Sequence, residues 1–215
     1  MVTFLVVLLG WLFSLSLHEF SHALVAYKGG DITVKEKGYL DFDLFKYTHP
    51  VYSILLPMLF LIMGGIGLPG GAVYIESWRL KNRWWETAVS IAGPSSNLIV
   101  AIVLAIILRF DAVVSSPVGP GLAFLALLQV TAFFFNLLPV PPFDGYGALR
   151  PHLNVPLRAQ MDFFGQFSMW IVILLLWYVP FVSDSFWMVI DLFAMLLGIP
   201  LDAAYMGYSL FRFWQ

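Results

Sequence analysis

Five apolar stretches in this sequence are each long enough to cross a lipid bilayer as a helix, which takes about 20 residues. They cover residues 2–26, 87–109, 121–140, 165–182 and 185–200. Hydrophobic residues make up 60% of the chain and charged residues 11%, which leaves too little polar surface for a soluble globular protein. The sequence therefore predicts an all-α polytopic membrane protein in the lipid bilayer, with about five to six transmembrane helices.

Charge and cysteine content narrow the classes of function. The formal net charge is −2 and no block of basic residues is present, which argues against nucleic acid as a partner. The chain contains no cysteine, so histidine and carboxylate side chains are the candidate metal ligands. The first apolar stretch lacks a basic leader and a small-residue cleavage site, and we therefore expect a retained span rather than a signal peptide.

The first apolar stretch contains the sequence His-Glu-Phe-Ser-His at residues 18–22. Residues four apart lie on one face of a helix, so His18 and His22 can both direct a ring nitrogen at one metal ion. In an HExxH arrangement the intervening glutamate, here Glu19, serves as general base towards the attacking water. The alternative is an ordinary polar turn of a helix. Three ionisable side chains in a membrane span are costly unless a bound cation and its solvent compensate them, which favours the metal site.

A second candidate site lies where the apolar stretch 121–140 ends. Prolines at positions 139, 141 and 142 interrupt it just before Asp144. Such a break frees backbone polar groups, which is tolerated at membrane depth only beside protein or a water-filled cavity. Asp144 is therefore a candidate third metal ligand. The alternative is an acid that caps a helix end at the membrane interface.

The segment 50–66 decides the topology. It contains Pro57 and ends in a glycine cluster, so it either crosses the membrane or returns to the side that it came from. If it crosses, the two histidines and Asp144 lie at opposite membrane faces and cannot share an ion. If it does not, all lysines and arginines except Arg109 fall on one side, as expected for the cytoplasmic face. We therefore expect a re-entrant or interfacial segment and an active site towards the cytoplasm.

Two short segments have strand-like patterns. Residues 32–47 are polar and rich in turn residues, with Val34, Tyr39 and Phe42 among charged ones, which predicts a small β-hairpin at the membrane surface. Residues 70–75, which begin with two glycines, predict a second short strand.

Three motifs together resemble the site-2 protease family of intramembrane zinc metalloproteases. Residues 18–22 resemble its HExxH, residues 136–145 its Asn-x-x-Pro-x-Pro-x-x-Asp-Gly element, and residues 93–97 its Gly-Pro-x-x-Asn. They occur in the family's order and spacing over residues 10–150. Residues 48–75 further resemble the compact branch of the family that lacks a PDZ domain.

The resemblance implies that His18, His22 and Asp144 hold one Zn²⁺ per chain, that a water completes a tetrahedral site, and that Glu19 activates this water. The implied reaction is hydrolysis of peptide bonds within or next to transmembrane segments of membrane-protein substrates. We expect a prokaryotic cell-membrane protein with a catalytic transmembrane core at 1–160 and C-terminal transmembrane helices at 161–215.

Substrate contacts are predicted at several further positions. A helical substrate must unwind before attack because its carbonyls are hydrogen-bonded within the helix, and an edge strand can hold it open. Gly71, Val73 and Tyr74 are the residues that we expect to provide such an edge. Asn136 is expected to contact the substrate backbone or the oxyanion. His49 is either interfacial or approaches the site if the following segment folds back.

Two functions of other classes remain alternatives at this point. A membrane metal-ion transporter can use the same ligands, and a non-catalytic pseudoprotease can bind membrane partners without hydrolysis. Transport does not explain Glu19, which is poorly placed as a ligand and well placed as a base. The presence of all four catalytic positions of the family argues against a pseudoprotease.

Overall fold

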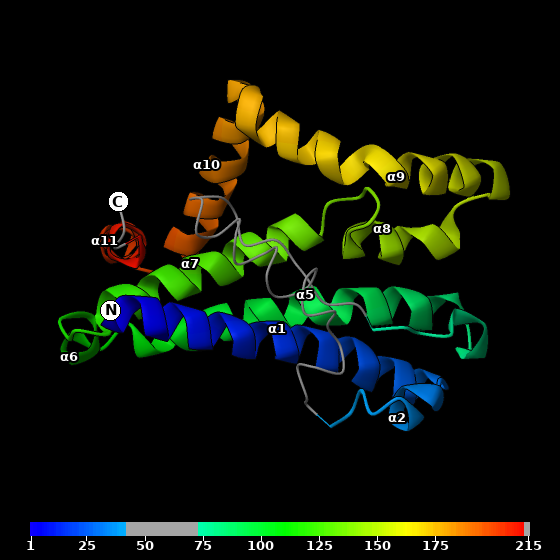
Figure 1. Ribbon diagram of the computed structural model, residues 1–215, viewed down its shortest axis with the longest axis horizontal. Coiled ribbons are helices and arrows are strands. Elements are labelled where there is room, and N and C mark those ends of the chain that lie inside the picture. The colour runs from blue at the N-terminus through cyan, green and yellow to red at the C-terminus, as the bar shows by residue number, and fades with distance from the viewer. Residues whose placement is uncertain (42–72, 213–215) are drawn as a thin grey trace.

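The computed structural model describes residues 1–41 and 73–212, and these residues form a helical protein with no β-strand among them (Figure 1). Five helices are long and apolar enough to cross a membrane: α1 (Val2–Gly29), α5 (Arg83–Ile107), α7 (Gly119–Asn136), α9 (Val155–Tyr178) and α10 (Pro180–Leu197). They correspond to the five predicted spans, and the chain is an all-α membrane protein in its described part. Residues 50–66 lie outside it.

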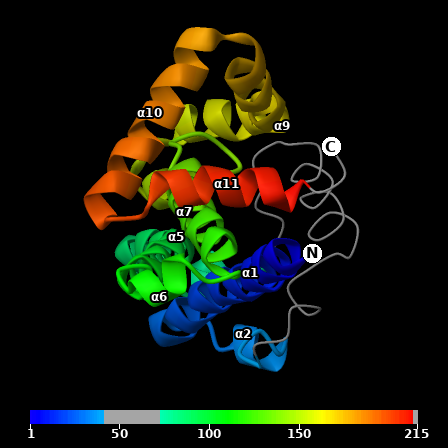
Figure 2. The ribbon, with the colours of Figure 1, turned by 90° about the vertical axis from the view of Figure 1, so that its left-hand side faces the viewer.

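Shorter helices connect or follow these spans: α2 (Thr33–Glu36), η2 (Ser77–Arg79), α6 (Asp111–Val114), α8 (Asp144–Leu149), η3 (Arg150–His152) and α11 (Leu201–Phe211). Figure 2 shows α11 between the α9–α10 pair and the group formed by α1, α5 and α7. Gly207 permits the close approach of α11 to α7, because a side chain there would overlap the backbone carbonyl of Pro120.

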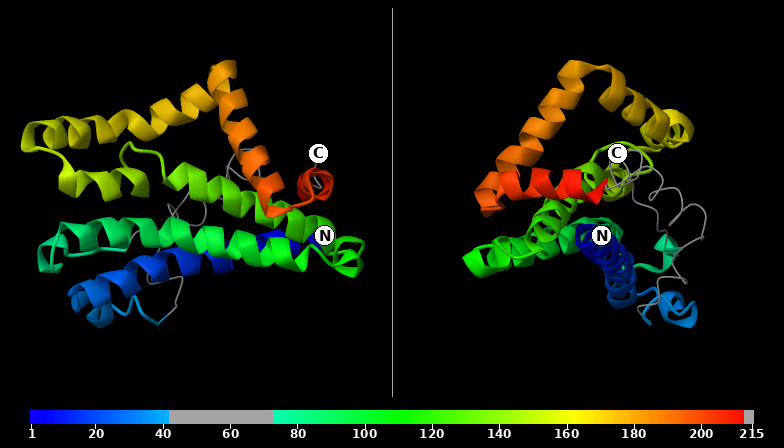
Figure 3. Two further views of the ribbon diagram at one scale, coloured as in Figure 1. Left: turned by 180° about the vertical axis from the view of Figure 1, so that it is seen from behind. Right: turned by 60° about the vertical axis from the view of Figure 1, so that its left-hand side comes forward.

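The main apolar core joins α1, α5 and α7, which lie against one another (Figures 1 and 3). Trp11 of α1, Leu104 of α5 and Leu127 of α7 are buried in one cluster, to which α10 adds Ile190. The metal-ligand candidates do not belong to this cluster. The main core therefore lies beside the candidate site and contains none of its candidate ligands.

Helices α9 and α10 stand apart from this scaffold over most of their length (Figure 1). Most of their large apolar side chains are exposed, as Phe163, Trp170 and Leu196 illustrate, and lipid is the medium that suits such surfaces. The inner side of α9 nevertheless packs through Ile173 and Leu176 on Phe143, directly before Asp144. Helix α9 thus covers one side of the turn that carries the third candidate ligand.

The prediction of a β-hairpin at 32–47 is wrong for its described part. Residues 33–36 form α2, and the following residues up to 41 are turns. The reason is the carboxylate of Asp31, whose Oδ1 accepts hydrogen bonds from the Thr33 backbone N–H at 3.0 Å and from the Thr33 hydroxyl at 2.6 Å. These local side-chain bonds hold a turn at the start of α2 in place of an extended strand. Residues 42–47 lie outside the described part of the chain.

The second predicted strand is only partly described. Residues 73–76 belong neither to a helix nor to a strand. Residues 70–72 lie outside the described part. Val73 and Ile75 are half-buried and Tyr74 is 77% exposed, so the side chains alternate as they do in an extended chain.

Candidate metal centre

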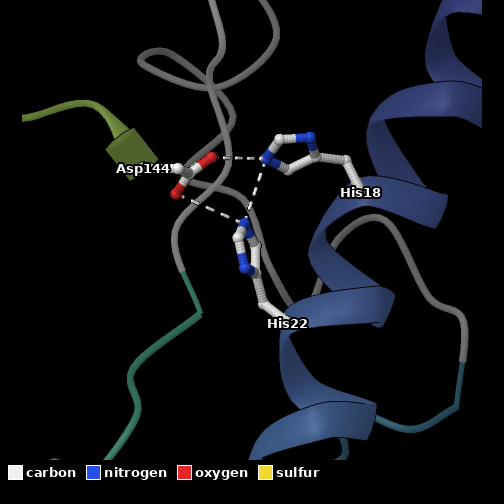
Figure 4. A group of neighbouring side chains, drawn as sticks. All are labelled: His18, His22 and Asp144. Carbon is white, nitrogen blue, oxygen red and sulfur yellow. Dashed lines mark hydrogen bonds and ion pairs between the residues drawn. The ribbon is translucent and has the colours of Figure 1, made fainter. Parts of the chain in front are cut away.

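Two of the candidate ligands lie on the buried face of α1. His18 and His22 are 4% and 7% exposed, and their Nε2 atoms are 3.0 Å apart (Figure 4). Helical spacing brings both rings to one point, as the sequence predicts. The Nδ1 atom of His22 lies 2.7 Å from the carbonyl oxygen of Val89 on α5. A proton on Nδ1 donates to this carbonyl and leaves the Nε2 lone pair available to a metal.

Asp144 reaches the histidines from the start of α8, after the proline-rich turn that ends α7. Its Oδ2 lies 3.2 Å from Nε2 of His18, and its Oδ1 lies 3.5 Å from Nε2 of His22 (Figure 4). Gly145 makes this fold possible, because a Cβ there would overlap the backbone of Leu137 at the end of α7. The turn is also held from α9, where the buried hydroxyl of Ser168 donates to the carbonyl of Pro141.

These three residues fit a zinc ion. One ligand atom from each lies within 4.8 Å of the others. Nitrogen and oxygen ligands at zinc's usual distance of about 2.0–2.1 Å lie about 3.3 Å from one another in a tetrahedral site. The observed separations of 3.0, 3.2 and 3.5 Å span that value. Two imidazoles and one carboxylate are also a donor set that suits Zn²⁺ and leaves a fourth position for water or substrate.

Glu19 is buried, at 3% exposure, but is not part of the group of three ligand residues. The backbone of Val73 lies close to this carboxylate. Glu19 and the three ligand residues line one cavity of about 370 Å³. The carboxylate therefore shares a cavity with the three candidate ligands but lies outside the group whose ligand atoms converge.

Two of the predicted substrate-contacting residues line the cavity. Val73 and Asn136 line it, and Ile75 and Met169 add apolar wall. The amide of Asn136 donates to the carbonyl of Ala132 in its own helix at 3.0 Å, which leaves the amide oxygen as its acceptor group.

The three other predicted residues are Tyr74, Gly71 and His49, and of these Tyr74 alone lies in the described part of the chain. Tyr74 is not part of the cavity lining and points away, with its carbonyl accepting from Lys37 Nζ at 3.1 Å. Gly71 and His49 lie outside the described part of the chain, so the predictions for them stay predictions.

Gly93 of α5 is a functional position that the residue-by-residue reasoning missed. A Cβ at this position would overlap Nε2 of both His18 and His22. The absence of a side chain therefore leaves room for both imidazoles to point between α1 and α5. The signal was present in the sequence, because Gly93 opens the Gly-Pro-x-x-Asn motif.

Hydrogen bonds that the sequence did not predict hold α8 from two sides. Asp162 of α9 accepts hydrogen bonds from the Tyr146 hydroxyl at 2.5 Å and from the Arg150 guanidinium at 2.7 and 3.0 Å. On the side of α5, Thr87 donates to the carbonyl of Ala148 at 2.9 Å. These contacts hold the short helix that begins with Asp144.

Comparison with known proteins agrees with this geometry. The sequence model of peptidase family M50 matches residues 4–117. Rip2 of Mycobacterium tuberculosis is 43% identical over 214 residues, which is 99% of this chain and 82% of the relative. Rip2 of Mycolicibacterium smegmatis is 42% identical, with the same shares of both chains. YwhC of Bacillus subtilis is 33% identical over 81% of this chain and 80% of the relative.

All three relatives are named as zinc metalloproteases. No solved structure matches the chain. The family match covers more than half of the chain, and it includes the HExxH sequence, Gly93 and the helices that carry them. The chain therefore belongs to peptidase family M50, the site-2 proteases.

Proposed function

We propose that His18, His22 and Asp144 hold the single zinc ion of this intramembrane metalloprotease and that Glu19 is its general base. The observation that carries the proposal is the convergence of three ligand atoms, at spacings that suit zinc, beside a buried carboxylate that is not one of them. Membership of family M50 supports peptide-bond hydrolysis over metal transport.

The chemistry divides between the ion and the chain. Zinc, when bound, polarises the scissile carbonyl and lowers the pKa of the attacking water. Glu19 takes one proton from the water as its oxygen bonds to the carbonyl carbon, and then gives that proton to the amine nitrogen as the C–N bond breaks. His22 is oriented by the Val89 carbonyl.

The proposed substrates are membrane proteins cleaved within or next to a transmembrane segment. The position of the candidate site in α1, a span with 28 residues, supports a cut at membrane depth. The cavity wall at Val73 and Ile75 supports an extended substrate strand running along this segment, and Asn136 offers its amide oxygen to the substrate backbone. We keep residues 1–160 as the proposed catalytic core and 161–215 as the C-terminal helices.

The proposed topology has no net crossing between α1 and α5. The backbone N–H of Lys81 donates to the carbonyl of Gly29 at 2.9 Å, so the end of α1 and the residues just before α5 lie at the same end of the scaffold. This supports a re-entrant or interfacial segment between them. Three lysines lie in the last turn of α1 or shortly after it: Lys28, Lys35 and Lys37. Basic residues prefer the cytoplasmic side of a membrane, which supports an active site that opens to the cytoplasm.

The proposed orientation predicts one-sided labelling in a chain that has no native cysteine. Cysteine in place of exposed Lys35 should react with a membrane-impermeant maleimide only when the cytoplasmic face is accessible. Cysteine in place of exposed Asp111, after α5, should react from the opposite face. Labelling of both from one face would contradict the topology, and the reverse pattern would contradict the cytoplasmic orientation.

Zinc content tests the ligand assignment without a substrate. We expect about one zinc per chain in the detergent-purified wild type and less than about a tenth of that in Asp144→Ala, because two histidines alone leave the ion without its third protein ligand. Asp111→Ala, which removes an exposed acid of α6, serves as the matched control and should keep its zinc. Zinc retained in Asp144→Ala would show that the third ligand, and the topology that depends on it, are wrong.

A further inference from the structure

Asp31 is a fully buried carboxylate that the proposed chemistry does not use. It follows Gly30 at the end of α1, and its exposed fraction is 0%. Besides the two bonds from Thr33 to its Oδ1, its Oδ2 accepts a hydrogen bond from the backbone N–H of Glu76 at 2.8 Å. A buried carboxylate is costly unless it is hydrogen-bonded, so three donors at one residue indicate a fixed structural role. The Glu76 bond ties the metal-bearing helix to the segment that lines the cavity.

A second side chain holds the same segment from the same side. Lys37 donates from Nζ to the carbonyl of Tyr74 and to Oε1 of Glu76, each at 3.1 Å. Arg79 donates to Oε2 of Glu76 at 2.7 Å. The hydrogen bonds from Arg79 and Lys37 hold the pKa of the Glu76 carboxyl below its usual value, so the cluster is charged at neutral pH.

The two edges of the segment 73–76 are therefore not equivalent. In an extended chain the N–H and C=O of one residue point to one edge, and those of its neighbours point to the other. The carbonyl of Tyr74 and the N–H of Glu76 share one edge, and both are occupied, by Lys37 and Asp31.

The other edge belongs to Val73 and Ile75. Val73 and Ile75 line the cavity that also contains Glu19, and the backbone of Val73 lies close to this carboxylate, so we assign this edge to the side of the catalytic group. Among the hydrogen bonds of the described residues, none uses the N–H or C=O of Ile75 or the C=O of Val73. These groups are the ones that an incoming extended peptide can pair with.

We propose that Asp31 and Lys37 are positioning residues that occupy the outer edge of the segment 73–76, so that an unwound substrate pairs with the inner edge at Val73 and Ile75. This inference rests on the proposed proteolytic function and adds to it the backbone groups that receive the substrate. Pairing through the main chain makes recognition tolerant of substrate side chains, with the apolar wall at Val73 and Ile75 favouring residues from membrane segments.

Asp31→Asn and Thr33→Val form a matched pair that separates positioning from simple helix capping. The asparagine keeps an oxygen for Thr33 but places an NH₂ donor opposite the Glu76 N–H, which breaks that bond alone. The Thr33→Val variant removes the 2.6 Å hydroxyl bond to the same carboxylate and leaves the Glu76 bond intact.

The first arm is hydrogen–deuterium exchange of the zinc-loaded full chain. We expect Asp31→Asn to raise the exchange rate of the amides of residues 74–79 at least about tenfold, because an amide hydrogen bond slows exchange. Thr33→Val should leave these rates within about twofold of the wild type, and zinc content should stay at one per chain in both. Unchanged exchange in Asp31→Asn, or equal acceleration in Thr33→Val, would overturn the positioning role.

The second arm measures cleavage of fluorescein-labelled β-casein, an unfolded protein that can present extended chain. We expect Asp31→Asn to raise KM at least about tenfold with little change in kcat. Ile75→Pro, which removes an inner-edge N–H, should lower kcat/KM at least about tenfold, and Tyr74→Pro, which removes an outer-edge N–H, less than about threefold. Equal proline effects would overturn the edge assignment. A zinc-loaded wild type that cleaves no casein would count against the protease function itself, while exchange would still decide the role of Asp31.

Discussion

Glu19→Gln will abolish peptide hydrolysis and leave one zinc ion per chain. Glutamine has nearly the same shape as glutamate but cannot take a proton from water, and a positioned general base contributes about 10²–10⁴-fold to rate. Glu19 is 3% exposed, so bulk water does not offer an easy substitute. We expect the turnover of labelled β-casein to fall about 10³-fold or more, measured beside zinc content by inductively coupled plasma mass spectrometry.

Glu86→Gln is the control for this variant, because Glu86 lies in the first turn of α5 and is outside the cavity lining. Its turnover should match that of the wild type. Retained hydrolysis in Glu19→Gln would assign the base elsewhere. Loss of zinc from Glu19→Gln would instead make Glu19 a ligand. If the wild type cleaves nothing, and Glu19→Gln moves metal ions across vesicle membranes as fast as the wild type does, the protein is a transporter and not a protease.

Gly93→Ala will remove most of the zinc although it adds only a methyl group. Alanine in a helix interior normally stabilises the helix relative to glycine by up to about 1 kcal/mol. Here the methyl would overlap Nε2 of both histidines, so the rings must turn away from the position where they converge with Asp144. We expect zinc content to fall below about a tenth of the wild-type value and hydrolysis to fall in parallel, both measured on the same preparation.

Gly121→Ala is the matched control for the effect of a methyl group between packed helices. Its Cβ would come 3.2 Å from the side chain of Val6, where α7 meets α1. The Val6 side chain would have to move much less than the histidine rings must move in Gly93→Ala. This variant should keep its zinc and fold at the same yield. Zinc loss of equal size in both variants would point to general loosening of the helices, and full zinc content in Gly93→Ala would show that the histidines have more room than their geometry indicates.

The convergence of His18, His22 and Asp144 could be predicted from the sequence because each part of it follows from a local rule. The spacing of His18 and His22 is one helical turn, and helical spacing alone brings their rings together. Asp144 follows a run of prolines that must end the helix before it. The placement of basic residues then indicates that the histidines and Asp144 share one membrane face. In the structure the carboxylate oxygens of Asp144 lie 3.2 Å from Nε2 of His18 and 3.5 Å from Nε2 of His22.

The remaining features depend on contacts between distant segments and could not be predicted in the same way. The role of Gly93 arises from the packing of α5 against α1, which local periodicity does not reveal. The turn of α2 is held by the hydrogen bonds of Thr33 to Asp31, which override the hairpin-like, turn-rich pattern that begins at residue 32. The bond between Asp31 and Glu76 joins residues 45 positions apart.

The ligands come from two places that the main core does not itself connect: the second half of α1 and the start of α8. The core of α1, α5 and α7 is closed by apolar contacts in which no ligand takes part. Helix α8 is itself held to α5 and α9 by hydrogen bonds in which no candidate ligand takes part. The packing of the chain thus gathers three side chains for a metal ion in advance, so the ion does not have to supply the free energy that folds the protein.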